Sequence, residues 1–205
     1  MKLQLTLVLI CVLLPKALTL QCYQCIPGLT GTCTDTQTTC PDRCGSATVH
    51  VSAAGVEQTV RTKDCAAAAE CVSGSLNLGV MKMTMNTQCC TTDRCNSQFP
   101  AVLPLGSLNG NKCYTCTDND CRATVSCEGD EDHCLSATAT AGGVQVAVKG
   151  CVSRNLCTAE ESSMQAAGIT GSVSCCEGNL CNGAEGVKLS LLIMLVPLIF
   201  STLFI

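Results

Sequence analysis

Alternation of hydrophobic and polar residues along the middle of the chain predicts β-hairpins. Two pairs of alternating runs each flank a glycine-containing turn: residues 47–51 and 56–63 around Ala53-Ala54-Gly55, and residues 135–140 and 144–149 around Gly142-Gly143. A period of two places alternate side chains on opposite faces of a strand, and glycine allows the tight turn between two strands. The pattern therefore predicts one central hairpin in each half of the chain.

A third strand is predicted in the first half by the run from Val80 to Asn86, which alternates and carries methionine at Met81, Met83 and Met85. Three flexible thioethers on one strand face can bind partners, but packing against the neighbouring finger or the other unit is the favoured role. Residues 66–70 are long enough for only one helical turn, because so short a segment cannot form a stable helix alone. The readable local structure is thus β throughout.

The N-terminal end carries a continuous apolar run and not an alternating one. Lys2 precedes an apolar run from Leu3 to Leu14, and the small residues Ala17 and Thr19 follow it. Such a pattern predicts a secretory signal peptide over residues 1–19, since a dozen apolar residues fall short of the ~20 that span a bilayer. The remaining chain then enters the secretory pathway and an oxidising compartment.

The C-terminal end predicts a glycosylphosphatidylinositol (GPI) anchor. A largely apolar stretch covers residues 189–205, with no Lys or Arg after it, and the small residues Asn182-Gly183-Ala184 lie just upstream. Small residues followed by a spacer and an apolar tail are typical of an attachment site whose tail is removed. Asn182 is the first candidate for lipidation, Gly183 and Ala184 are the alternatives, and residues 183–205 form the propeptide. A single-pass helix is the competing interpretation.

Composition narrows the class of protein. The chain has 205 residues and 21 cysteines, with no Trp, two Tyr and three Phe. Such a cysteine content is typical of a disulfide scaffold, and the scarcity of aromatic residues excludes one large aromatic core. Between residues 20 and 182 there are nine basic and fifteen acidic residues, a formal charge of −6. The basic residues form no cluster, so no nucleic-acid partner is expected, and nothing in the sequence calls for a cofactor.

The cysteines repeat in two sets of ten. Both sets open with Cys-Tyr-x-Cys and close with Cys-Cys-x4-Cys-Asn. Cys11 leaves with the signal peptide, so 20 cysteines can pair completely. The repetition predicts a first domain at residues 20–96 and a second at residues 112–182. Residues 97–111 carry prolines and glycines and no cysteine, which indicates a linker.

This pattern resembles the Ly6/uPAR superfamily, whose domains adopt the three-finger fold, and the resemblance covers nearly the whole region between the two ends. It implies a small disulfide-rich all-β protein of two tandem three-finger (snake-toxin-like) domains. Physical geometry adds one constraint: neighbouring strand residues face opposite sides, so Cys89 and Cys90 should take different partners, as should Cys175 and Cys176. Spacing alone leaves the other pairings open.

The resemblance implies a full set of pairings and four structural residues. The implied disulfides are Cys22–Cys44, Cys25–Cys33, Cys40–Cys65, Cys71–Cys89 and Cys90–Cys95 in the first domain, and Cys113–Cys134, Cys116–Cys121, Cys127–Cys151, Cys157–Cys175 and Cys176–Cys181 in the second. In the family the final asparagine, here Asn96 and Asn182, ties the closing strand to the cysteine knot. Tyr23 and Tyr114 are expected in the hydrophobic centre. Asn182 would then be both a fold residue and the lipid acceptor.

A few residue patterns could support metal binding or catalysis, but each has a simpler structural role. The Cys-x2-Cys pairs could begin a zinc site, but secretion favours disulfides, so no metal site is predicted. The acidic stretch Glu128–Asp132, with Asp118 and Asp120 nearby, lacks EF-hand spacing and is expected to be a solvated turn. His50 and His133 lie in different repeats, so no catalytic residues and no enzyme activity are predicted. Phe99 is expected to plug the space between the domains.

The function predicted from the sequence is binding at the outer leaflet of the plasma membrane. A GPI-anchored, two-domain protein would present rigid fingertips to an extracellular protein ligand. The expected tips are residues 30–39, 53–57, 141–143 and 160–168. Because the sequence has two units and not three, urokinase binding is not implied. The alternative is a secreted two-domain protein like the phospholipase A2 inhibitors of the same superfamily.

Overall fold

The computed structural model describes residues 19–28, 31–117, 120–141, 144–158 and 173–183. Among these residues, contacts define two units. The first unit holds residues up to 50, 58–73 and 85–103, and the second holds residues 51–57, 74–84 and those from 104 onward. The second unit therefore includes the tips of two hairpins that belong to the first cysteine repeat.

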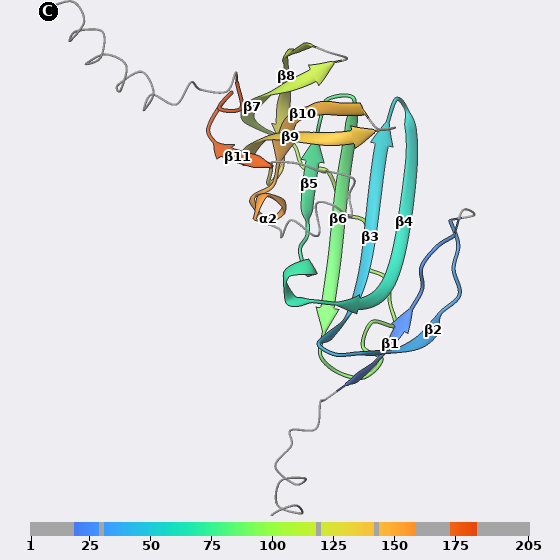
Figure 1. The fold of residues 1–205 in the computed structure, drawn as a ribbon. Helices are drawn as coiled ribbons and strands as arrows, with labels where there is room; N and C mark the ends of the chain where they lie inside the picture. Colours follow the sequence, from blue (N-terminus) through green and yellow to red (C-terminus); the bar gives the residue numbers. More distant parts are fainter. Residues whose placement is uncertain (1–18, 29–30, 118–119, 142–143, 159–172, 184–205) are drawn as a thin grey trace, which may run out of the picture. The chain divides into compact units, whose positions relative to one another are not determined.

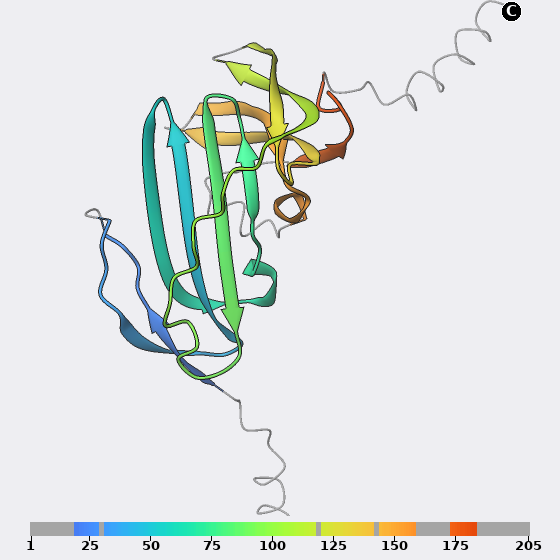
Figure 2. The ribbon, with the colours of Figure 1, turned by 180° about the vertical axis from the view of Figure 1, so that it is seen from behind.

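The first repeat is built from six strands and one 3-10 turn. They are β1 (Leu20–Gln24), β2 (Thr36–Cys40), β3 (Arg43–Ala53), β4 (Val56–Ala66), η1 (Ala68–Glu70), β5 (Gly74–Asn77) and β6 (Met81–Cys90). β1 and β2 form an antiparallel pair in the register Leu20↔Cys40. β5, β6, β3 and β4 are neighbours in that order, and β6, β3 and β4 are long strands whose directions alternate (Figures 1 and 2).

The second repeat has five described strands and one helical turn. They are β7 (Leu108–Thr117), β8 (Asp120–Glu128), β9 (His133–Ala141), β10 (Val144–Val152), α2 (Arg154–Cys157) and β11 (Ser174–Glu177). β7 pairs with β8, and β9 lies between β10 and β11, all antiparallel. At its other edge β10 pairs briefly with β5, with Cys151 opposite Asn77.

The strands confirm the hairpins that alternation predicts. The runs 47–51 and 56–63 lie within β3 and β4, and the runs 135–140 and 144–149 lie within β9 and β10. The run from Val80 corresponds to β6, and the expected helical turn is η1. The observed strands are longer than the predicted runs because backbone pairing continues past the alternating residues into the cysteines at their ends.

Ten disulfides cross-link the described residues, and they join the same cysteine pairs that the family resemblance implies. In the first repeat Cys22, Cys40 and Cys44 form a buried cluster, and in the second Cys113, Cys127, Cys134 and Cys151 do so. A disulfide typically adds about 2–4 kcal/mol to stability, mainly because it restricts the unfolded chain. Sulfur-rich clusters thus occupy positions that aliphatic and aromatic side chains hold in larger domains.

The segment between the repeats is bound at both ends. The Thr48 hydroxyl donates to the carbonyl of Pro100, 2.7 Å, within the first unit. Gly129 N–H donates to the carbonyl of Ser107, 2.9 Å, within the second unit. Strand β7 begins at Leu108, inside the stretch predicted as a linker. Proline and glycine content alone does not show these contacts, because they depend on residues distant in sequence.

Phe99, predicted to plug the space between the domains, makes its described ring contact within the first unit. Its ring lies 4.4 Å from the Lys63 ammonium nitrogen, and both residues belong to the first unit. A cation over an aromatic face is attracted by the ring's negative quadrupole. Phe99 therefore belongs to a contact of the first repeat with its own C-terminal extension.

The methionine strand face is half-buried. Met81, Met83 and Met85 are each of intermediate exposure, whereas Thr84, on the opposite face of β6, is 2% exposed. The one buried residue of β6 is therefore polar and lies on the face opposite the methionines. Partial burial of the thioethers agrees with packing as their main role.

Candidate binding site

The turn between β3 and β4 forms an exposed tip. Ala54 and Gly55 have φ of 50° and 80°, the left-handed conformation that both central residues of a type I′ hairpin turn require. Glycine adopts it without strain, while alanine does so at some cost. Residues 54–57 are exposed, and Val56 exposes 69% of its surface. The hairpin therefore presents an aliphatic side chain to solvent.

The turn between β5 and β6 forms a second exposed tip. The Asn77 side-chain oxygen accepts a hydrogen bond from Gly79 N–H, 3.0 Å, and Gly79 has a φ of 79°. Leu78 N–H donates to the carbonyl of Met81, 2.8 Å. Val80 follows with 62% of its surface exposed. We name residues 54–57 and 79–80 together the fingertip surface; both turns belong to the second unit and lie at the same end of their strands in Figures 1 and 2.

Covalent bridges hold the bases of the fingers. Cys40–Cys65 links the end of β2 to the end of β4, and Cys71–Cys89 spans the hairpin that contains β5 and β6. Beside the second tip, Lys82 Nζ lies 2.7 Å from a carboxylate oxygen of the half-buried Glu128. Because the fingers are ordered before any partner arrives, binding does not incur the entropy cost of fixing them.

Asn96 closes the first repeat with its carboxamide. Its oxygen accepts the backbone N–H of Tyr23, 2.9 Å, and its nitrogen donates to the carbonyls of Tyr23, 2.8 Å, and Gly45, 2.9 Å. The residue is 2% exposed. Three bonds to the main chain of β1 and β3 explain why an asparagine follows the last cysteine: it provides a donor and an acceptor on one short side chain.

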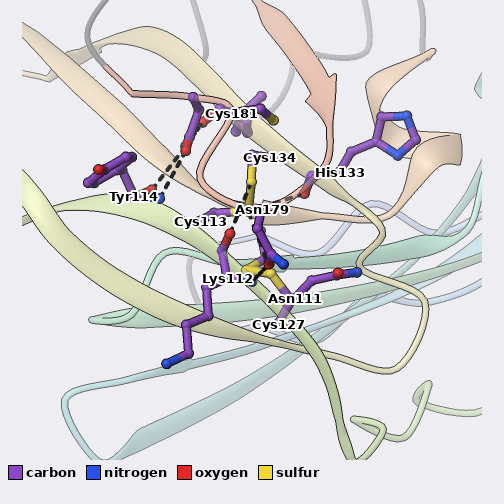
Figure 3. Close-up of a disulfide and its surroundings, with 12 residues drawn as sticks. Asn111, Lys112, Cys113, Tyr114, Cys127, His133, Cys134, Asn179 and Cys181 are labelled. Carbon is purple, nitrogen blue, oxygen red and sulfur yellow. Dashed lines mark hydrogen bonds between the residues drawn. A yellow bond between two sulfur atoms is a disulfide. The ribbon is translucent and has the colours of Figure 1, made fainter.

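Asn182 repeats this arrangement in the second domain. Its oxygen accepts the backbone N–H of Tyr114, 2.9 Å, and its nitrogen donates to the carbonyls of Tyr114, 2.9 Å, and Leu135, 2.7 Å. Close by, Lys112 N–H donates to the side-chain oxygen of Asn179, 2.7 Å, beside the Cys113–Cys134 bridge (Figure 3). The two closing asparagines thus have equivalent partners in the two repeats.

Tyr23 and Tyr114 differ from their expected place in the hydrophobic centre, since both are only half-buried. Each follows a fully buried cysteine, Cys22 at 0% and Cys113 at 1% exposure. Because successive strand side chains face opposite sides, the disulfide occupies the centre and the tyrosine ring lies outside it. The backbone of each tyrosine is the part that binds the closing asparagine.

Two lysines that neither the alternation of residues nor the cysteine spacing points to also bind the closing segments. Lys63, 2% exposed, donates from Nζ to the carbonyl of Ser97, 2.7 Å, and pairs with Asp35, 2.7 Å. Lys149 donates from Nζ to the carbonyls of Asn182, 2.8 Å, and Gly183, 2.9 Å. The sequence does show that the two lysines are equivalent, because each lies two residues before an equivalent cysteine of its repeat.

The cysteine sulfurs that lie close enough to hold a metal are not thiolates. Among the described residues, the sulfurs of Cys113, Cys127 and Cys151 lie within 4.8 Å of one another. All three belong to disulfides, one to Cys113–Cys134 and two to Cys127–Cys151. Zinc binding requires deprotonated thiols, so these bridged sulfurs act as structural links.

The acidic turn has its own partners. Glu128 pairs with Lys82, and the Asp132 carboxylate lies 2.7 Å from His133 Nδ1 and 3.2 Å from the Arg154 guanidinium. Burial opposes the ionised form of Asp132, but the hydrogen bond and charge of His133 and the charge of Arg154 outweigh it and lower its pKa. The stretch is therefore a hydrogen-bonded turn and not the fully solvated one expected from the sequence, since Glu131 is 0% exposed and accepts the N–H of Glu128.

The histidines are also separately engaged. His50 Nδ1 lies 2.9 Å from the Thr59 hydroxyl, and His133 bonds to the adjacent Asp132. Asp118, Ala184, residues 142–143 and the predicted tip at residues 160–168 lie outside the described residues. Within the described part of the chain, no helix is long and apolar enough to cross a membrane.

Two cysteine-bridged β repeats, each with protruding hairpins and a carboxamide closure, define a disulfide-rich three-finger-like protein. Comparison with known proteins agrees with this class. The u-PAR/Ly-6 domain matches twice, over residues 18–98 and 109–184. The chain therefore belongs to the Ly6/uPAR family and carries two of its domains.

Similar proteins include inhibitors and receptors. Phospholipase A2 inhibitor PIP of Malayopython reticulatus is 29% identical over 72% of this chain and 81% of its own length. The urokinase plasminogen activator surface receptor of Rattus norvegicus is 31% identical over 56% of this chain and 39% of its length. Ly6/PLAUR domain-containing protein 3 of the same species is 28% identical over 80% and 54%. The chain thus spans most of the inhibitor and about half or less of the other two.

Proposed function

We propose that this protein is a GPI-anchored binding module of the cell surface that presents its fingertip surface to an extracellular protein ligand. The observation that carries the proposal is the exposure of Val56 and Val80 on turns whose fingers are fixed by disulfides. An exposed aliphatic side chain on a preorganised turn can enter a partner's pocket without a cost for ordering the loop. Relatives named as a receptor and as inhibitors support binding as the activity.

Catalysis is not part of the proposal. The one imidazole of the second repeat, that of His133, pairs with the carboxylate of Asp132. The other histidine, His50, binds the hydroxyl of Thr59 within its own hairpin. Both imidazoles thus have structural partners, and the proposed activity is binding through the surface.

The membrane link rests on the sequence. Three small residues, Asn182 to Ala184, precede the apolar stretch at residues 189–205, an order typical of GPI attachment. A GPI anchor at these residues and a signal peptide at residues 1–19 would together put the two domains at the outer face of the plasma membrane. Residues 20–182 would then form the bulk of the exposed protein.

Proximity labelling on cells that express the full chain tests the binding surface. A V56D/V80D variant should lose the extracellular proteins that the wild type labels, because a carboxylate cannot enter an apolar pocket without losing its water. Leu108→Asp provides a matched control, since Leu108 is 68% exposed and lies outside the fingertip surface. Retention of the same labelled proteins by V56D/V80D would contradict the proposal.

A second candidate function is inhibition of a secreted phospholipase A2. It is favoured by the python inhibitor, of whose length this chain spans 81%. Purified ectodomain added to a secreted phospholipase A2 acting on phospholipid vesicles distinguishes the two functions. Unchanged hydrolysis agrees with the proposed ligand-binding role, whereas stoichiometric inhibition would favour the inhibitor.

A further inference from the structure

The turn between β8 and β9 buries a carboxyl group that is only half satisfied. Glu131 is 0% exposed, and its Oε2 accepts the backbone N–H of Glu128, 2.9 Å. Its other oxygen, Oε1, is buried and has no hydrogen-bond partner among the described residues. An ionised oxygen in such a place has lost its water without gaining a partner, which is costly. The geometry of the turn therefore favours the protonated carboxyl.

A strand of the first cysteine repeat covers this carboxyl. We call residues 74–84, which hold β5 and the start of β6 and belong to the second unit, the β5 finger. The side chain of Ser75, on β5, is close enough to Glu131 to influence its ionisation. The Ser75 N–H donates to the Ser153 hydroxyl, 2.9 Å, and its carbonyl accepts the N–H of Ser153, 3.0 Å. Glu131 thus lies where the β5 finger is bound to the second repeat.

The remaining contacts of the β5 finger with the second repeat are mostly between neutral groups. The Asn77 side-chain nitrogen donates to the carbonyl of Ser126, 3.3 Å, and the Thr115 hydroxyl donates to the carbonyl of Leu78, 2.6 Å. Backbone pairing with β10 adds two residue pairs. Amide and hydroxyl groups keep the same charge across the physiological pH range. These contacts therefore do not change with pH, unlike a carboxyl group.

Two charged groups face Glu131 from neighbouring strands. Glu128, at the end of β8, disfavours a second negative charge beside it, and Lys82, on β6, favours one. The two pair with each other at 2.7 Å, so their opposite effects partly cancel. Burial is the largest influence on Glu131, and it raises the pKa of the carboxyl above the usual 4.5.

The other charged side chains of the turn have partners of their own or face solvent. Asp130 is exposed, and Asp132 binds His133, 2.7 Å, and Arg154, 3.2 Å. His133 also carries a titratable ring, so an experiment on this turn has to change Glu131 alone.

Opening of the covering strand is the route by which an ionised Glu131 can regain water. A protonated carboxyl has no net charge and provides an O–H donor at the oxygen that otherwise lacks a partner. Burial then costs much less, and the strand stays in place. Local openings of this kind need less free energy than global unfolding, so a single carboxyl can bias them.

We propose that Glu131 is a proton-dependent switch for the β5 finger, which stays bound to the second repeat while the carboxyl is protonated and opens more often when it is ionised. Val80, at the tip of this finger, is part of the fingertip surface. Mildly acidic surroundings would therefore order the tip, and neutral surroundings would loosen it. That consequence for binding rests on the proposed function, whereas the switch itself does not.

Hydrogen exchange of the purified, disulfide-bonded two-domain protein without any ligand tests the switch. Amide protection in β5 is compared at about pH 7.5 and about pH 5.5, after correction for the intrinsic exchange rates. We expect protection to rise toward acid, by about tenfold for each unit by which the pKa is raised. Wild-type protection that does not change with pH would overturn the inference, while leaving the labelling test of V56D/V80D to decide the proposed function separately.

Matched variants assign the effect to one carboxyl. Glu131→Gln cannot ionise, so its β5 amides should keep the acid-level protection at both pH values. Glu57→Gln, which changes an exposed carboxyl of the same unit, should respond like the wild type. An equal rise toward acid in Glu131→Gln would contradict the switch.

A measurement on the wild type needs no variant to fold. The Glu131 side-chain carboxyl carbon, followed by NMR, should titrate with the same midpoint as the change in β5 protection. Two different midpoints would assign the change to another group and overturn the inference.

Discussion

At the scale of single residues, one carboxamide at the end of each repeat joins three backbone groups that are distant in sequence. For Asn96 these groups belong to Tyr23 and Gly45, and for Asn182 they belong to Tyr114 and Leu135. Neither tyrosine is fully buried. The residue that ties the closing segment to the cysteine knot is therefore the asparagine, and the tyrosines contribute mainly their backbone.

Truncation of either closing asparagine should destabilise the purified, disulfide-bonded ectodomain. Asn96→Ala and Asn182→Ala each leave three buried backbone groups unpaired, and we expect a loss of about 3 kcal/mol in the free energy of unfolding. Asn179→Ala is the control, because Asn179 is exposed and accepts a single hydrogen bond. Urea unfolding measures the difference. A loss no greater than that of Asn179→Ala would show that the carboxamides do not close the repeats.

Glu131 makes stability depend on pH. The residue is 0% exposed, and burial raises its pKa above the usual 4.5, although the N–H of Glu128 stabilises the charged form. The folded state therefore binds a proton more readily than the unfolded state. Stability contributed by the protonated form is present at low pH and is lost as pH rises through the raised pKa.

We predict that the second unit becomes more stable as pH falls from 7 toward about 4.5, the usual pKa of the carboxyl. Glu131→Gln should flatten this dependence, because glutamine keeps the shape and the acceptor for the Glu128 N–H but has no ionised form. Thermal unfolding across this pH range measures the effect. The same slope in wild type and Glu131→Gln would assign the pH dependence to another group.

At the scale of elements, β10 depends on a glycine. A Cβ at Gly150 would lie 2.2 Å from the carbonyl oxygen of Asn77 and 2.9 Å from a methyl of Leu78. Strand β5 therefore lies beside β10 only because position 150 has no side chain. This pairing covers two residue pairs, Cys151 opposite Asn77 and Val152 opposite Leu76.

Gly150→Ala should separate these strands and destabilise the second unit by roughly 1–3 kcal/mol, the usual cost of overpacking. Gly28→Ala is the matched control, since a Cβ there meets nothing within 4 Å. Hydrogen exchange should show lost protection in β5 and β10 for Gly150→Ala alone. Equal protection in both variants would mean that the strands tolerate the added methyl group.

The elements differ in how well the sequence predicts them. The β3–β4 and β9–β10 hairpins follow from alternation because a period of two is their packing pattern. Strand β2 is the polar sequence Thr-Gln-Thr-Thr-Cys and shows no such alternation. Its pairing with β1 and the Cys40–Cys65 bridge hold it in place. Strand β7 similarly begins in a segment whose glycines and asparagines favour a loop.

At the scale of the whole molecule, the duplicated cysteine pattern predicts the family, and the resemblance implies the pairings that the structure contains. The fingertip at residues 54–57 follows from its turn sequence. The roles of Lys63 and Lys149 could not be read from hydrophobicity, because each is a cation, Lys63 buried and Lys149 half-buried, that binds carbonyls at the far end of its repeat. Comparing the two repeats position by position is what identifies such residues.

The central claim is that the two domains are held at the cell surface by a glycolipid. The most direct test measures the protein on intact cells that express the full chain, before and after treatment with phosphatidylinositol-specific phospholipase C. We predict that the protein moves from the cells into the medium only after treatment. Protein that stays on treated cells, or that is already free in the medium of untreated cells, would contradict the claim.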